Sequence, residues 1–113
     1  MASAHVLEFT DANFDQEVLQ SAVPVLVDFW APWCGPCMKL GPTIDQVAAE
    51  FSGKAKVGKL NIDENMMKAG SLGIRSIPTI MIFKGGKLHR QHVGLLSKAD
   101  IEKLLNDALS AAA

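Results

Sequence analysis

Short apolar runs, separated by polar and turn-forming residues, predict five strands in this chain. The strands are expected in runs rich in branched and aromatic residues, at 6–9, 23–30, 55–62, 77–83 and 87–93. The second run is almost continuously apolar, which is typical of a strand buried on both faces of a sheet. Gly85-Gly86 separates the last two runs and predicts a two-residue hairpin.

Helical periodicity appears between these strands. It is clearest in the second half of the segment 34–51, where the apolar residues Ile44, Val47, Ala48 and Phe51 share one helix face. Helices are also predicted near 11–20, over 64–72, and after a capping box at Ser97-x-x-Asp100, before an Ala111–Ala113 end that is expected to fray. The order βαβαβ followed by αββα predicts an α/β domain with a mixed sheet and helices on both faces.

Composition narrows the classes of function. A chain of 113 residues has room for one domain, which we expect to span 1–113. A net charge of −1 gives no electrostatic footprint for nucleic acid or an anionic membrane. The residues at the N-terminus do not resemble a secretory signal, nothing later approaches a membrane span, and two cysteines are too few for a disulfide-stapled secreted scaffold. These features predict a cytoplasmic protein.

The candidate chemistry lies in Trp33-Cys34-Gly35-Pro36-Cys37, which holds both cysteines of the chain. The motif stands between a buried strand and a helix. At a helix opening, unpaired backbone N–H groups and the positive end of the helix dipole favour the thiolate, the form of sulfur that attacks. This spacing beside a βαβ pattern is typical of a redox pair. A structural disulfide and half of a metal site are the alternatives, although the scattered His5, His89 and His92 make a zinc site unlikely to form.

A polar residue interrupts the buried run before the motif. Asp28, between Val27 and Phe29, is expected to be desolvated, which raises the pKa of a carboxyl group. Such a group can exchange a proton with Cys37 near neutral pH. The alternative is an aspartate at a strand end that accepts hydrogen bonds from loop N–H groups. Met66-Met67 is interpreted as gap-filling core rather than a metal ligand pair.

The motif with its flanks, Trp30-Ala31-Pro32-Trp33-Cys34-Gly35-Pro36-Cys37, closely resembles the active site of the thioredoxin family. Three further segments follow in family order and at family spacing: Lys59-Leu60-Asn61-Ile62-Asp63, Gly73-Ile74-Arg75-Ser76-Ile77-Pro78-Thr79 and Val93-Gly94. The resemblance covers roughly residues 5 to 110. It implies a three-layer sandwich, in which about four helices flank a central mixed sheet of about five strands.

The resemblance also implies a protein-disulfide reductase with assigned roles. Cys34 is the nucleophile and Cys37 resolves the mixed disulfide, while Gly35 and Pro36 keep the two cysteines close at the helix start. Asp28 has Lys59 as its partner; an edge-exposed lysine is the alternative. Pro36 stands where more oxidising relatives often carry His, and it favours a reductant.

A substrate-docking surface around Cys34 is implied as well, with a cis peptide bond before Pro78. Its residues are Trp33, Ile62, Ile77, Pro78 and Gly94. Plain core packing is the alternative for Ile62, and a strand-start proline is the alternative for Pro78. The sequence departs from the family at Met38, where a basic residue is usual and the base moves to Lys39, and at Asn65-Met66-Met67, where a proline is common.

The implied partners are disulfide-containing proteins and a thioredoxin reductase that delivers electrons from NADPH. The expected protein is a cytoplasmic monomer in electron transport and cell redox homeostasis, with no bound cofactor or metal and no nucleic acid or membrane partner. Two other classes stay open: a thioredoxin-like binding subunit in which the cysteines hardly matter, and a metal carrier that uses Cys-x-x-Cys.

Overall fold

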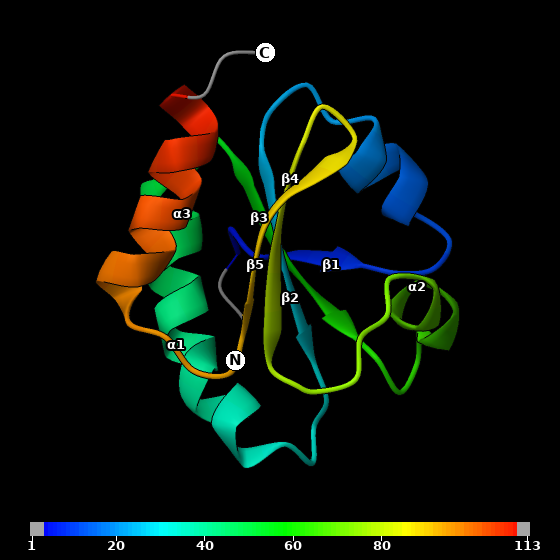
Figure 1. Cartoon of the computed structure of the whole chain (residues 1–113). Coiled ribbons are helices and arrows are strands. Elements are labelled where there is room, and N and C mark those ends of the chain that lie inside the picture. Colours follow the sequence, from blue (N-terminus) through cyan, green and yellow to red (C-terminus); the bar gives the residue numbers. More distant parts are fainter. Residues whose placement is uncertain (1–3, 111–113) are drawn as a thin grey trace.

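The computed structural model describes residues 4–110 and divides them into nine elements (Figure 1). The strands are β1 (Leu7–Phe9), β2 (Val25–Trp30), β3 (Lys56–Asn61), β4 (Thr79–Lys84) and β5 (Lys87–Val93). The helices are α1 (Gly35–Glu50), α2 (Met66–Ser71), α3 (Lys98–Ser110) and a short π-helical segment, η1 (Asp15–Leu19). This order confirms the predicted one. The fraying predicted for Ala111–Ala113 falls outside the described residues.

The five strands form one mixed sheet in the order β1-β3-β2-β4-β5. Both β1 and β2 run parallel to β3, whereas β4 is antiparallel to β2 and β5 is antiparallel to β4. Figure 1 shows α1 and α3 on one side of the sheet, with η1 and α2 on the other. The expected three-layer α/β sandwich is therefore confirmed. Gly85 and Gly86 adopt φ values of 60° and 79°, as the two-residue hairpin loop requires.

Two apolar cores cover the two faces of the sheet. The core under α1 and α3 includes Leu26, Leu40, Ile44, Val47, Ile80, Ile82, Ile101 and Leu105. The core under η1 includes Phe9, Phe14, Val18, Val25, Val27, Phe29, Leu60, Met81 and Phe83. Apolar residues of β2 contribute to both cores, so this strand is buried on both faces, as predicted. Its carboxyl end leads directly into the cysteine motif.

The first helix is shorter than its prediction. The side chains of Thr10 and Asn13 bond to each other's backbone: Asn13 N–H donates to Thr10 Oγ1 at 3.1 Å, and Thr10 N–H donates to Asn13 Oδ1 at 2.7 Å. This reciprocal pair has the arrangement of a capping box, and Phe14 N–H donates to the Thr10 carbonyl at 3.0 Å. The regular helical segment nevertheless starts only at Asp15.

The interpretation of Met66-Met67 as core was wrong. Their exposed fractions are 72% and 78%, because the short α2 buries only Ala69. The predicted strand start at residue 77 was also too early. Pro78 has no N–H for the sheet, and β4 begins after it, at Thr79.

Candidate active site

Cys34 is the N-cap of α1, and its sulfur meets the unpaired amides of that helix end. Its backbone is extended, with φ −90° and ψ 108°, and Cys37 N–H donates to Cys34 Sγ at 3.2 Å. Gly35 and Pro36 form the exposed first turn, where the missing N–H of proline breaks no helical hydrogen bond. A bond to sulfur from an amide at the positive end of a helix stabilises a thiolate.

A disulfide joins Cys34 to Cys37, with 5.2 Å between their Cα atoms. The two sulfurs are not equally accessible, because 5% of Cys34 and only 1% of Cys37 is exposed. Cys34 is therefore the less deeply buried of the two.

Most of the predicted docking residues come together around this pair. Ile62 and Ile77 are partly buried and pack, with Trp30, against the cluster formed by Ala31, Cys34 and Cys37. The carbonyl oxygen of Ile77 lies 3.8 Å from Cys34 Sγ. The peptide bond between Ile77 and Pro78 is cis, as the resemblance implied.

Gly94 and Trp33, the other two predicted docking residues, each make one hydrogen bond to a neighbouring segment. Gly94 N–H donates to the Pro78 carbonyl at 2.8 Å, and its φ of 97° suits glycine. Trp33 is 70% exposed, and its indole N–H donates to the carboxylate of Asp63 at 3.0 Å. Sequence reasoning missed this role of Asp63. The position of Asp63 just beyond β3 was the available signal, because neighbouring parallel strands end at the same edge of the sheet.

Asp28 is fully buried in β2, on the face that α1 covers. Its side chain points to the same face of β2 as those of Leu26 and Trp30, which both pack on that side. Neither carboxyl oxygen has a hydrogen-bond donor among the described residues, so the alternative of a strand-end aspartate bonded to loop amides was wrong. Burial raises the pKa of Asp28 to about 7, and the positive charge of Lys59 opposes this rise. The carboxyl can therefore gain or lose a proton near neutral pH.

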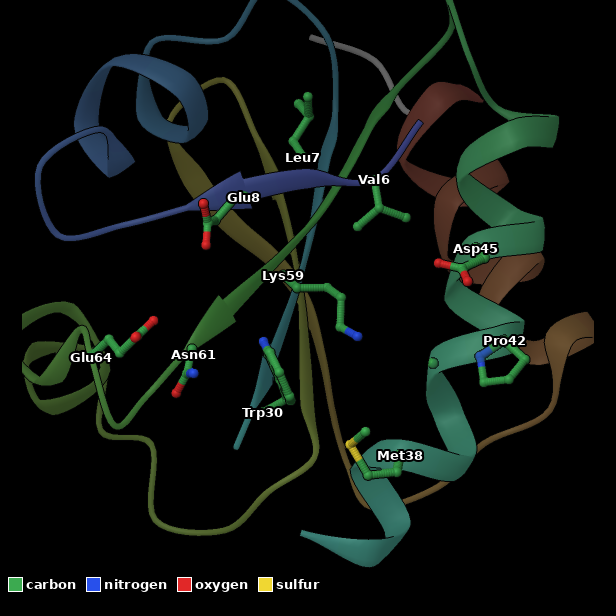
Figure 2. Close-up of a pocket in the computed structure, with 11 residues that line it drawn as sticks. Val6, Leu7, Glu8, Trp30, Met38, Pro42, Asp45, Lys59, Asn61 and Glu64 are labelled. Atoms are coloured by element: carbon green, nitrogen blue, oxygen red, sulfur yellow. The ribbon is translucent and has the colours of Figure 1, made fainter. Parts of the chain in front are cut away.

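Lys59 is the Cα partner of Asp28 in the next strand. Because β3 lies between β1 and β2, the alternative of an edge-exposed lysine was wrong. Its ammonium does not bond to Asp28; Lys59 Nζ lies over the ring of Trp30, 4.6 Å from the ring centroid. Figure 2 shows both side chains in a hollow of about 780 Å³ between α1 and the strands β1 and β3. Met38, at 55% exposure, lines the same hollow, whereas Lys39 does not.

The histidines make contacts away from the cysteines. His89 bonds to Asp107, and His92 bonds to the Leu95 carbonyl. Within residues 4–110, no group of three or more His, Cys, Asp or Glu is placed to hold a metal ion. Over the same residues, no helix combines the length and apolar character needed to cross a membrane.

A disulfide at a helix N-terminus, with a fully buried carboxyl in the preceding strand of a mixed α/β sheet, defines a dithiol–disulfide oxidoreductase. Comparison with known proteins gives the family. The thioredoxin family model matches residues 5–107. A thioredoxin of Chlorobaculum thiosulfatiphilum is 57% identical over 100 residues, which are 88% of this chain and 93% of the relative.

Two further relatives show the same extent of similarity. Thioredoxin 1 of a Nostoc species is 53% identical over 102 residues, or 90% of this chain and 95% of the relative. The thioredoxin of Pseudomonas aeruginosa is 49% identical over 104 residues, or 92% and 96%. The chain belongs to the thioredoxin family. With its Cys34–Cys37 pair, it is a protein-disulfide oxidoreductase.

Proposed function

We propose that this protein reduces disulfides in other proteins by passing them the two electrons of its Cys34–Cys37 dithiol. The observation that carries the proposal is the hydrogen bond from Cys37 N–H to Cys34 Sγ at the start of α1, which favours a Cys34 thiolate. This thiolate attacks one sulfur of the substrate disulfide, forms a mixed disulfide and expels the other substrate sulfur as a thiolate.

Cys37 then completes the exchange. Its thiolate attacks Cys34 Sγ, the second substrate sulfur leaves, and the Cys34–Cys37 disulfide remains. The substrate gains two electrons and the protein loses two. Asp28 accepts the proton of the Cys37 thiol in this step, a role supported by its burial and by a pKa of about 7. The positive charge of Lys59 offsets part of the free energy needed to charge the buried Asp28, so Lys59 belongs to the proton-transfer group.

We propose that substrates dock on the rim around Cys34. The contacts of Ile62 and Ile77 with the cysteine cluster support this assignment, as does the exposed ring of Trp33. An extended substrate segment lies against the backbone of Ile77, Pro78 and Gly94. Gly35 and Pro36 hold the cysteines at the helix start, and the absence of a histidine between them favours reduction over oxidation.

The remaining assignments follow from family membership. Residues 1–113 act as one monomeric, cytoplasmic domain with no bound cofactor, and the disulfide is reduced again by a thioredoxin reductase that takes electrons from NADPH. Reduction of insulin disulfides by this protein, coupled to NADPH oxidation through such a reductase, tests the proposal. We expect full turnover by the wild type and none by Cys34→Ser. A folded Cys34→Ser variant that turns over at the wild-type rate would overturn it.

A further inference from the structure

The Lys59 ammonium and the Asp28 carboxyl are neighbours that do not pair. Their Cα atoms are partners in β3 and β2, and both side chains lie on the face of the sheet under α1. Opposite charges so placed ordinarily form an ion pair. Here no N–O distance of 4.0 Å or less joins them, and both Asp28 oxygens lack a hydrogen-bond donor among the described residues.

The face of Trp30 is what Lys59 contacts instead. Lys59 Nζ lies 4.6 Å from the ring centroid, and among residues 4–110 it has no hydrogen bond or ion pair. Indole is the aromatic ring that attracts a cation most strongly. The backbone of α1 passes close above, since a Cβ added at Gly41 would lie 3.8 Å from the ammonium. The ring and the helix thus flank the Lys59 head group, which lines the hollow.

The other groups near Asp28 and Lys59 do not explain why the two side chains form no ion pair. Asp28 is the Cα partner of Lys59 in β3 and of the apolar Ile80 in β4, and it lies on the face of the sheet that α1 covers. Lys59 shares its hollow with the carboxylates of Asp45 from α1 and Glu8 from β1 (Figure 2), yet it bonds to neither. Among residues 4–110, the ring of Trp30 is therefore the group seen to hold the ammonium in place of Asp28.

We propose that Trp30 is a positioning residue: its ring holds the Lys59 ammonium out of an ion pair with Asp28, so that Asp28 keeps its affinity for a proton. This inference rests on the proposed proton exchange between Asp28 and Cys37. A direct ion pair would keep Asp28 charged at neutral pH and fix its oxygens on the lysine. When the Lys59 ammonium lies over Trp30, it does not contact Asp28, and its charge lowers the proton affinity of Asp28 less than a direct ion pair would.

The test is the titration of the Asp28 carboxyl carbon by NMR in the oxidised protein, where the cysteines do not titrate. In Trp30→Leu, Lys59 is released, and we expect the Asp28 midpoint to fall by about one pH unit, as for a carboxyl beside a cation. Trp30→Phe keeps a ring and is expected to restore most of the midpoint. It also serves if Trp30→Leu does not fold.

Lys59→Met provides the matched background. If the ring acts through the lysine, removing the ring in Lys59→Met leaves the Asp28 midpoint unchanged. An equal fall with and without Lys59 would show that Trp30 only excludes water, and no fall in either background would also overturn the inference. The titration uses no substrate, so it tests the role of Trp30 alone. A failure of the proposed proton exchange would show up separately, as a normal rate of mixed-disulfide resolution in Asp28→Asn.

Discussion

At the residue scale, Asp28 is where stability and chemistry oppose each other. Its carboxyl is fully buried and has no hydrogen-bond donor within residues 4–110, and burial raises its pKa from 3.8 to about 7. A shift of this size corresponds to about 4 kcal/mol between the charged and neutral forms, at 1.36 kcal/mol per pKa unit. The folded protein loses this stability when Asp28 is charged, and in return it has the carboxyl that we propose as the proton acceptor of Cys37.

Replacing Asp28 by Asn should therefore stabilise the protein in a pH-dependent way. Below pH 3.8 the carboxyl is neutral in both the folded and the unfolded chain, so it adds no pH dependence. Between 3.8 and about 7 the folded state binds the extra proton, so wild-type stability falls as pH rises; above about 7 the loss is complete. Urea unfolding of the oxidised proteins from pH 4 to 8 should show the advantage of Asp28→Asn growing by up to about 4 kcal/mol. A constant difference would contradict the assignment.

The same substitution should affect one step of the exchange more than the other. Asn cannot take the proton of the Cys37 thiol, whereas attack by Cys34 does not need it. Stopped-flow measurement with a disulfide substrate should show slower resolution of the mixed disulfide in Asp28→Asn, by about 10²-fold or more, and nearly normal initial attack. Unchanged resolution would refute the proton-transfer role.

At the element scale, the close contact between β1 and β3 depends on Gly58. A Cβ at this position would lie 2.5 Å from the Phe9 ring and 2.7 Å from the Leu7 carbonyl oxygen. At Gly70, in α2 and exposed, a Cβ would meet nothing within 4 Å. Packing between the strands therefore requires glycine at position 58, whereas glycine at position 70 has no packing role and weakens α2.

Alanine at the two positions should thus change stability in opposite directions. We expect Gly58→Ala to lower the free energy of unfolding by about 1–3 kcal/mol through overpacking. Gly70→Ala should raise it by about 0.5–1 kcal/mol, because alanine loses less conformational entropy in a helix. Both values can be read from urea unfolding. A wild-type stability for Gly58→Ala would show that β1 and β3 are less tightly packed than described.

Local sequence pattern predicted the strands well because both faces of the central strand are apolar and the turn glycines are unambiguous. It failed where a distant contact decides the outcome. The carboxylate of Asp11 caps the amides of Met67 and Lys68 at 3.2 Å and 2.8 Å. No periodicity reveals a cap that comes from a residue more than 50 positions away.

At the scale of the whole molecule, the fold brings separate segments together at one edge of the sheet. The carboxyl ends of the parallel strands β2 and β3 lead to the cysteine motif and to Asp63, and the loop before β4 adds Ile77 and Pro78. Ligands of α/β folds bind at this edge. The cysteines could be found from their spacing before a helix, and Asp28 because it interrupts an apolar run. The stack of Lys59 on Trp30 and the bond from Trp33 to Asp63 could not, because side-chain geometry across strands decides them.

The central claim is that Cys34 attacks and Cys37 resolves. The most direct measurement is the yield of protein–substrate mixed disulfides formed by the two single variants, separated on non-reducing gels. Cys37→Ser should accumulate the mixed disulfide, because attack still occurs and resolution cannot. Cys34→Ser should accumulate almost none, because Cys37 is buried. Equal trapping by both variants, or trapping by Cys34→Ser alone, would contradict the account.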